Sequence, residues 1–536
     1  MAAALLPSIF NDVIGPVMRG PSSSHSAAAV RIGLLVHDLC DGVPDVVELD
    51  YDTEGSLATT HTSQGTDMGL YGGLLGWAAD DARLPGAPAE LAARGTRIEV
   101  RKPTLNDPHP NTYRIHVERA GEAHDVIALS TGGGMIEVIS VDGHPVQLFG
   151  DAAVTLLTVE GAEAAAALEG VLVALSGADE VAVVPATSGD RYLIIATGQK
   201  PLDLDPVADR LASLGVSAVR SLRRVLPVGS RPGMTVPFNR AGELTEPETL
   251  DDRPLSDWAI AYEAARGGIT EAEVLAKARH ILDLMRRGVE TGLAGTEYED
   301  RILGWQSGRF TELAAAGALL DGGLLNRMIA YVTALMEAKS AMEVIVAAPT
   351  AGACATFPGA LLATIDEVEA TPEAAERALL TGGLIGVFVT NGSSFAAEVG
   401  GCQAETGAGA AMAAAALVEL AGGSADRSLS AASQSLQNVL GLICDPVGNR
   451  VEAPCLGRNV TGAANALSCA NMALAGYDHL IPFDEVVDTH RQVSELMARE
   501  LRCTGLAGLA TTPTAKRIEL GLTRRAASTP APAGRP

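Results

Sequence analysis

Hydrophobic and polar positions follow two different patterns along the chain. From about residue 255 to about residue 521, apolar residues recur at i, i+3 and i+4, as in ITEAEVLAKARHILDLMRRGVETGL, which predicts amphipathic helices. Residues 1–147 carry strand-like stretches such as VVELDYD, RIEVRK and YRIHVER, with helices expected near 26–39 and 66–80. The pattern predicts an α+β N-terminal domain over residues 1–147 and an all-helical domain over residues 255–521.

The segment between these two parts has a pattern of its own. Residues 152–228 read as strand, helix, two strands, helix and strand, and this βαββαβ order is that of a ferredoxin-like ACT module. Such modules usually have a Pro-Gly turn after the first strand, where this chain has GAE at 161–163, so amino-acid binding and a purely structural role both stay open. The polar residues 229–254, with Pro and Gly, predict a linker, and residues 522–536 predict a disordered tail.

Composition limits the classes of protein to which the chain can belong. Its 536 residues are too many for one hydrophobic core, and its net charge of −26 argues against nucleic-acid binding, which needs a basic surface. The alanine-rich residues 405–421 are interrupted by Glu405 and Glu419 and predict a buried helix rather than a membrane span. We expect no signal peptide, because no basic stretch precedes an apolar one at the N-terminus. The seven cysteines have no disulfide-like spacing and suit a reducing cytoplasm.

Three cysteines lie in segments that carry the strongest chemical signal: Cys402 in GGCQAETG, Cys444 in GLICDPVGN and Cys455 in EAPCLGRN. Gly or Pro beside each thiol indicates a loop, so the thiols can point at a common centre. A 4Fe-4S cluster normally takes four cysteines, and a cluster held by three keeps one iron open as a Lewis acid for a hydroxyl leaving group. No two of the three form a CxxC pair, so spacing alone leaves ordinary buried thiols as the alternative.

A serine cluster near the N-terminus is the second signal. Ser22, Ser23 and Ser24 in GPSSSHS precede a helix expected over residues 25–39. Hydroxyl and N–H groups at a helix N-terminus favour a carboxylate, although a serine cap without any ligand has the same sequence. His25 is the titratable group of this segment and a candidate for proton transfer, with a structural histidine as the alternative.

Four segments together closely resemble the iron–sulfur-dependent L-serine dehydratases: MRGPSSSHSAAAVRIG (18–33), APTAGACATFPGALLA (348–363), GGCQAETGAGAAMAAAA (400–416) and CDPVGNRVEAPCLGRN (444–459). The resemblance runs from about Ser8 to about Ala510 and covers a β-type and an α-type part, which are separate chains in some relatives. It implies that residues 1–147 are the β-type domain and residues 255–521 the α-type domain.

The resemblance also implies a function. It implies a lyase that converts L-serine into pyruvate and ammonia without pyridoxal phosphate, on a 4Fe-4S cluster held by Cys402, Cys444 and Cys455. The residues implied in substrate contact are Ser22, Ser23, Ser24, Thr350, Gly352, Arg458 and Asn459. We expect a cytoplasmic homodimer that acts on a small amino acid and has no nucleic-acid or membrane partner.

Three positions depart from the family pattern. The family usually has Gly-His-Gly-Thr-Asp where this chain has Gln64 in SQGTD, so the base passes to His61, to His25 or to another group. Lys339 stands in a stretch that usually contains Asn, and it either pairs with a substrate carboxylate or lies on the surface. Cys503 is either a fourth ligand or a bystander, and we expect a bystander.

These departures keep two alternatives open beside the L-serine lyase. The first is the same cluster chemistry on another β-hydroxy or β-substituted amino acid, such as threonine. The second is a non-catalytic sensor of amino acids or redox state, built from the ACT-like module and the cluster. The intact GPSSSH and PTAGAC loops argue against the sensor, because a sensor needs no substrate clamp.

Overall fold

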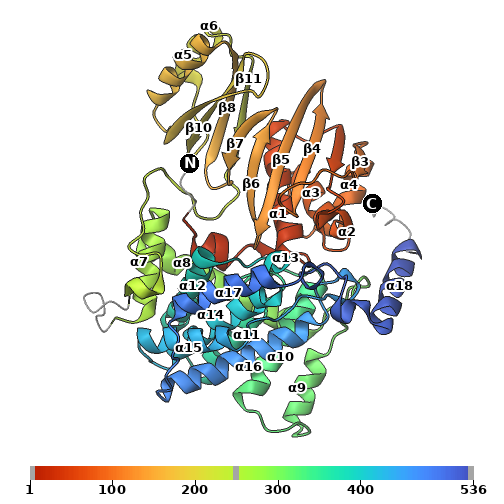
Figure 1. Cartoon of the computed structure of the whole chain (residues 1–536), viewed down its shortest axis with the longest axis vertical. Coiled ribbons are helices and arrows are strands. Elements are labelled where there is room, and N and C mark those ends of the chain that lie inside the picture. The colour runs from red at the N-terminus through yellow and green to blue at the C-terminus, as the bar shows by residue number, and fades with distance from the viewer. Residues whose placement is uncertain (1–5, 245–252, 529–536) are drawn as a thin grey trace. The chain divides into compact units, whose positions relative to one another are not determined.

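The chain forms two compact units in the computed structural model, which describes residues 6–244 and 253–528 (Figure 1). The mainly helical unit takes in residues 6–24, residues 132–134 and the described residues from 235 onward, and the rest forms a unit with two sheets. Sheets in the N-terminal part and helices in the C-terminal part confirm the predicted α+β class. The predicted domain boundaries themselves stay predictions.

Two predicted segments fall partly outside the described residues. Residues 245–252 of the predicted linker are outside, and its described part includes the short helical turn η5 (Ala241–Leu244). Residues 529–536 of the predicted tail are outside, and its described part forms the end of helix α18 (Pro513–Ser528).

The first sheet has six strands in the order β3-β2-β4-β5-β6-β7. Strands β2 and β3 are parallel, and β2, β4 and β5 form antiparallel pairs. Alternate residues of β4, namely Tyr113, Ile115 and Val117, are buried, as expected of a sheet with one covered face. The elements of this part are α1 (Ala28–Leu39), β2 (Val46–Asp50), α2 (Leu57–Thr60), α3 (Thr66–Leu74), η3 (Leu84–Gly86), α4 (Ala87–Ala93), β3 (Arg97–Arg101), β4 (Thr112–Arg119), β5 (Glu122–Gly132), β6 (Met135–Val141) and β7 (His144–Leu148).

Helices α1 and α3 touch along glycines. A Cβ on Gly33 would lie 2.4 Å from the carbonyl oxygen of Leu70, and a Cβ on Gly73 would lie 2.3 Å from the carbonyl oxygen of Val30. Two backbones approach this closely only where there is no side chain. The contact therefore holds α1, which begins shortly after His25, against α3.

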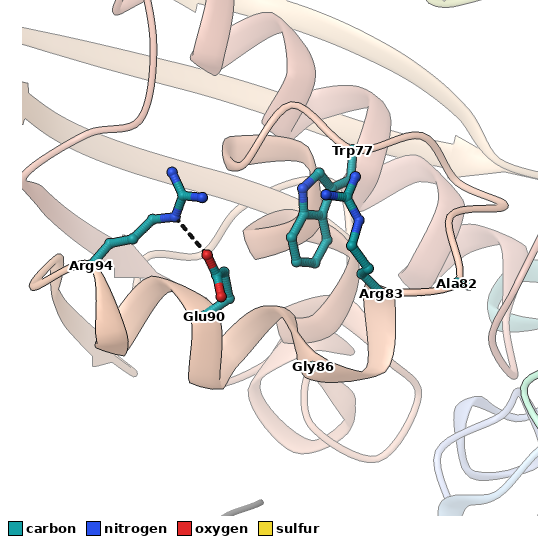
Figure 2. A pocket seen from close by; sticks show the side chains of 6 residues that line it. All are labelled: Trp77, Ala82, Arg83, Gly86, Glu90 and Arg94. Carbon is teal, nitrogen blue, oxygen red and sulfur yellow. Dashed lines mark hydrogen bonds and ion pairs between the residues drawn. The ribbon is translucent and has the colours of Figure 1, made fainter. Parts of the chain in front are cut away.

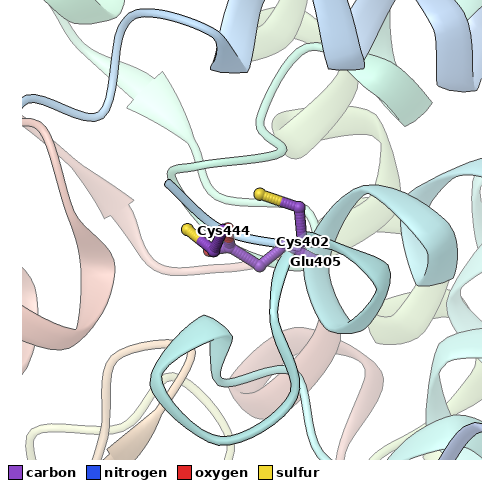
Figure 3. Close-up of side chains that lie close together, drawn as sticks. All are labelled: Cys402, Glu405 and Cys444. Atoms are coloured by element: carbon purple, nitrogen blue, oxygen red, sulfur yellow. The ribbon is translucent and has the colours of Figure 1, made fainter. Parts of the chain in front are cut away.

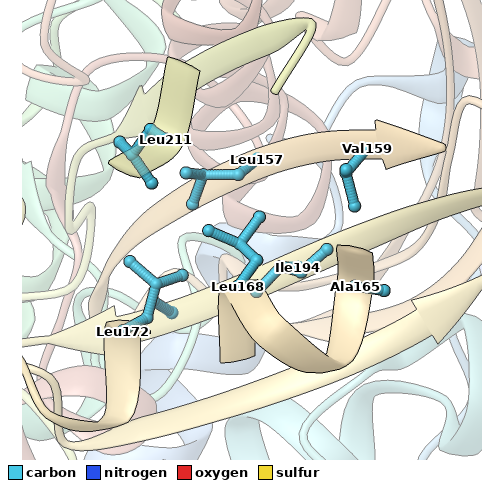
Figure 4. Close-up of a cluster of buried hydrophobic side chains, with 8 residues drawn as sticks. Leu157, Val159, Ala165, Leu168, Leu172, Ile194 and Leu211 are labelled. Atoms are coloured by element: carbon cyan, nitrogen blue, oxygen red, sulfur yellow. The ribbon is translucent and has the colours of Figure 1, made fainter. Parts of the chain in front are cut away.

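The second sheet has the order β11-β8-β10-β9 and shows the predicted βαββαβ succession. Its elements are β8 (Ala153–Glu160), α5 (Ala162–Val173), β9 (Glu180–Pro185), β10 (Arg191–Gly198), η4 (Asp205–Val207), α6 (Ala208–Ser213) and β11 (Ala218–Leu222). Strands β9 and β10 form the expected antiparallel hairpin. Leu157 and Ile194 on the sheet pack with Leu168 and Leu172 of α5 in one buried core (Figure 4).

The helical unit is built around α14 (Ala408–Leu420), which packs against four other helices, α11, α12, α15 and α16. Residues 408–418 are all buried, because Ala and Gly allow close packing on every side, as the alanine-rich pattern predicted. The other helices are α7 (Leu255–Gly267), α8 (Glu271–Ala294), α9 (Ser307–Ala315), α10 (Leu324–Ser340), α11 (Thr356–Glu367), α12 (Pro372–Gly392), α13 (Ala397–Gly400), α15 (Ala425–Gln437), α16 (Cys455–Leu474) and α17 (Phe483–Leu496). In the part of the chain that the structure describes, no helix combines the length and apolar character needed to span a membrane.

Candidate active site

A short pair of strands joins two segments of the helical unit, one that leads to Ser22–Ser24 and one that leads to the PTAGAC motif. β1 (Val17–Met18) pairs antiparallel with β12 (Ile345–Val346), and the segments that follow meet where the N–H of Ala351 donates to Ser23 Oγ (3.3 Å). The three predicted substrate-binding serines are all buried: Ser22, Ser23 and Ser24. The pairing thus brings the serine loop (residues 20–24) into contact with the PTAGAC loop (residues 349–354), which is far away in sequence. Ser23 and Ser24 themselves begin the helical turn η2 (Ser23–Ala27).

The PTAGAC loop (residues 349–354) also contacts the half-buried carboxyl group of Glu405. Thr350 Oγ1 donates to Glu405 Oε1 (2.7 Å). A Cβ on Gly352 would lie 2.7 Å from both carboxyl oxygens of Glu405, so only glycine permits this approach. Burial raises the pKa of Glu405 to about 7, and this group can therefore exchange a proton near neutral pH.

Asn459 ties the same loop to helix α16. Its Oδ1 accepts from the N–H of Thr356 (2.9 Å), and its Nδ2 donates to the carbonyls of Gly352 (2.9 Å) and Cys455 (2.8 Å). Asn459, a predicted substrate-binding residue, thus hydrogen-bonds to the backbone of the PTAGAC loop and to the backbone of Cys455.

The predicted ligand cysteines come from three different segments. Cys402 lies between α13 and the helical turn η6 (Gln403–Gly407), and Cys455 is the first residue of α16. The N–H of Cys444 donates to the carbonyl of Leu501 (2.8 Å), and its carbonyl accepts from the N–H of Cys503 (3.0 Å). All of these thiols are buried.

Cys402, Glu405 and Cys444 form a group of three possible metal ligands (Figure 3), with their ligand atoms all within 4.8 Å of one another. Cys455 lies outside that group, although its thiol is close enough to Cys402 for the charge of one to raise the pKa of the other. A cluster contains several irons, so its ligand sulfurs need not lie within the reach of one ion.

Cys503 lies close to these thiols, and its expected role as a bystander rather than a fourth ligand stays a prediction. It packs in one buried cluster with Cys402 and Cys444, and its thiol hydrogen-bonds to that of Cys444. The contact depends on an isolated parallel bridge between Cys444 and Arg502, a pairing of single residues that leaves no pattern in the sequence.

Arg458 has two partners beside the thiols. Its Nη2 donates to Asp445 Oδ1 (2.6 Å), and its Nη1 donates to Cys402 Sγ (3.4 Å). The other oxygen of Asp445 accepts from the N–H of Leu509 (2.7 Å). Asp445 was not among the residues predicted from the sequence, where its only signal is an acidic residue directly after Cys444.

Lys339 does not lie on the surface, so that alternative is wrong. It is 0% exposed, and its Nζ donates to the carbonyl of Val451, in the loop between Cys444 and Cys455. Residues 332–340 at the C-terminal end of α10 are all buried, and Lys339 is buried with them.

The thiols have the electrostatics of a metal-cluster site. Hydrogen bonds with Cys402 and Cys503, together with burial, raise the pKa of Cys444 well above its usual value, and burial raises that of Cys455. Neighbouring thiolates repel one another, so several of them coexist only beside positive charge. This buried set of sulfur donors, with a guanidinium on one of them, fits a 4Fe-4S cluster, whose irons would supply that charge.

The two candidate histidines belong to the unit with the sheets and differ in their surroundings. The Thr60 hydroxyl donates to the carbonyl of Ser56 (2.6 Å), so the Nε2–H of the fully buried His25 donates to Thr60 Oγ1 (2.9 Å). His61 is 14% exposed at its side chain, and its Nδ1 lies 2.9 Å from both oxygens of Asp67. A carboxylate on Nδ1 orients the ring and leaves Nε2 as the basic nitrogen.

Replacement of His25 by glutamine is expected to reduce the sensitivity of the fold to acid. Burial lowers the pKa of His25 from 6.5 to about 3, so the stability that its neutral form contributes is complete above pH 6.5 and is lost as the pH falls toward 3. Between about pH 7 and about pH 5 this loss is about 2 kcal/mol. Melting temperatures of wild type and His25→Gln across this range test it, and parallel curves would contradict it.

A surface hollow of about 440 Å³ is lined by none of the predicted site residues (Figure 2). Its lining includes Trp77, Arg83 and Arg94. The Arg83 guanidinium lies 4.4 Å from the centre of the Trp77 ring, and Arg94 pairs with Glu90 (2.8 Å). Both guanidinium groups in the lining of the hollow therefore already have partners within the protein.

Comparison with known proteins supplies the family context. The profile of the serine dehydratase alpha chain family matches residues 240–510. The chain is similar to the probable L-serine dehydratase, alpha chain, of Bacillus subtilis (38% identity over 282 residues, 53% of this chain and 94% of the relative). It is also similar to the L-serine dehydratase, alpha chain, of Peptoniphilus asaccharolyticus (38% identity, 49% of this chain and 90% of the relative). The matched residues include Cys402, Cys444, Cys455 and the PTAGAC loop. Ser22–Ser24 and the two candidate histidines, His25 and His61, precede the matched region.

Proposed function

The chain belongs to the serine dehydratase alpha chain family, and from that premise we propose that it is an L-serine ammonia-lyase, which releases pyruvate and ammonia. The observation that carries the proposal is that Glu405 connects the PTAGAC loop to the sulfurs of Cys402 and Cys444. Thr350 and Gly352 touch Glu405, and Glu405 lies within 4.8 Å of the sulfurs of Cys402 and Cys444.

We assign the 4Fe-4S cluster to Cys402, Cys444 and Cys455. When bound, the cluster would supply an iron with an open position, which acts as a Lewis acid on a hydroxyl leaving group. Arg458, which donates to Cys402 Sγ, stabilises the negative charge of a thiolate there.

The serine and PTAGAC loops would bind the amino acid. Their hydroxyl and N–H groups are buried and held in place, Ser23 by Ala351 and Thr350 by Glu405. Because Ser23 Oγ accepts from the N–H of Ala351, its own O–H is held as a donor, and an oriented donor binds a carboxylate without further loss of side-chain entropy. Arg458 and Asn459 have protein partners of their own, and direct substrate contact by either one stays a prediction.

For removal of the α-proton we favour His61 over His25. A base must accept a proton near the working pH, and burial holds the pKa of His25 at about 3. His61 is partly exposed, and Asp67 stabilises the positive charge that the ring would acquire.

The test is turnover by the full-length protein after anaerobic cluster reconstitution. We expect L-serine to shift the visible and EPR spectra of the cluster and to yield equimolar pyruvate and ammonia. L-threonine serves as the second substrate, because turnover of threonine without turnover of serine would move the same chemistry to another β-hydroxy amino acid. A cluster that responds to neither, with no product, would reject the lyase and favour a sensor.

A further inference from the structure

Lys339 is a buried cation at the centre of the helical unit. It lies in the last turn of α10 and is among the largest fully buried side chains of the chain. Its Nζ donates to the carbonyl of Val451, seven residues after Cys444 and four before Cys455. The ammonium group therefore faces the loop that carries two of the three assigned cluster ligands.

The acidic groups around Lys339 are engaged elsewhere. Glu405 accepts from Thr350 Oγ1 (2.7 Å), and Glu452 accepts from the N–H groups of Ile302 and Leu303 (both 2.9 Å). Within residues 6–244 and 253–528, the carbonyl of Val451 is the only hydrogen-bond or ion-pair partner of Lys339.

One carbonyl is poor compensation for a buried ammonium. The group has three N–H donors, and removing a charge from water costs several kcal/mol unless an opposite charge is close. An anion bound beside Lys339 would offset this cost. The other cation beside the thiols, Arg458, already has Asp445 as its carboxylate partner.

We propose that Lys339 binds the α-carboxylate of the amino-acid substrate. This inference depends on the proposed function for the identity of the anion, since every substrate of such a lyase carries a carboxylate next to the carbon that loses its proton. It limits the substrates to amino acids with a free α-carboxylate and excludes the corresponding amides and amino alcohols, which offer no negative charge to the ammonium.

The proposal can be tested by binding, independently of turnover. The full-length, anaerobically reconstituted protein is titrated with L-alanine, which has the carboxylate but no leaving hydroxyl, and with L-alaninamide, which lacks the charge. Wild type is expected to prefer L-alanine, and Lys339→Met to lose about 10- to 100-fold of that preference. Lys339→Arg should keep part of it. Lys516→Met is the matched control, because Lys516 is 52% exposed in a surface pair with Glu519.

Iron content and product formation separate the outcomes. If Lys339→Met binds less iron than wild type, the lysine serves the cluster thiolates and the inference fails. An unchanged preference in Lys339→Met also overturns it, even where wild type converts L-serine into pyruvate. A wild type that makes no pyruvate rejects the proposed function, and a loss of preference in Lys339→Met would support carboxylate binding even then. For L-serine turnover, the variant should raise KM far more than it lowers kcat.

Discussion

Replacement of Cys444 by serine is expected to remove the iron–sulfur cluster and with it all measurable lyase activity. Cys444 is 3% exposed, and its thiol interacts with those of Cys402 and Cys503, so it lies inside the group of sulfurs. A serine hydroxyl has nearly the same shape but does not ionise to replace a thiolate. Because Lewis-acid assistance contributes several kcal/mol, the loss should exceed about 10³-fold in kcat/KM.

Iron per protein and the visible spectrum after anaerobic reconstitution measure this directly. Cys469→Ser is the matched control, because Cys469 is a fully buried thiol within α16 that we assign no role. Cys503→Ser is expected to retain iron, since three ligands are proposed. A Cys444→Ser variant with the iron content of wild type would contradict the assignment, and iron loss in Cys503→Ser would raise the number of ligands to four.

The predictions that succeeded depend on patterns that repeat over many residues. The α+β class followed from strand-like alternation in the N-terminal part and helical periodicity in the rest. The βαββαβ order followed in the same way, because each of its elements buries a face against one small core, such as Leu168 of α5 against Leu157 of β8. Periodicity reports burial, and burial largely decides secondary structure.

The details of the site depend on single long-range contacts, which periodicity does not report. The two-residue strands β1 and β12 join the serine loop to the PTAGAC loop, and such short strands leave no alternation. Cys503 reaches Cys444 through one isolated bridge. Arg458 resembled a carboxylate-binding residue in the sequence, but the structure pairs it with Asp445. The burial of Lys339 likewise depends on what covers the end of α10.

Replacement of His61 by glutamine is expected to lower kcat for L-serine by about 10²- to 10⁴-fold, the usual contribution of a general base. His61 Nδ1 faces the Asp67 carboxylate at 2.9 Å, and the ring stays partly exposed, as a base must be to reach a proton. Glutamine preserves size and polarity but cannot accept the proton. KM should change little, and α-deuterated serine should show a larger isotope effect on kcat in the variant, because proton removal becomes slower.

The chain offers a close control for this experiment. His124 has the same kind of pair, with Nδ1 at 2.8 Å from Asp142 and a side chain 13% exposed, and it has no predicted part in the chemistry. His124→Gln is therefore expected to keep the kcat of wild type. Asp67→Asn should lose less activity than His61→Gln, because it disturbs the orientation of the ring but leaves the base in place. An unchanged kcat in His61→Gln, or an equal loss in His124→Gln, would exclude His61 as the base.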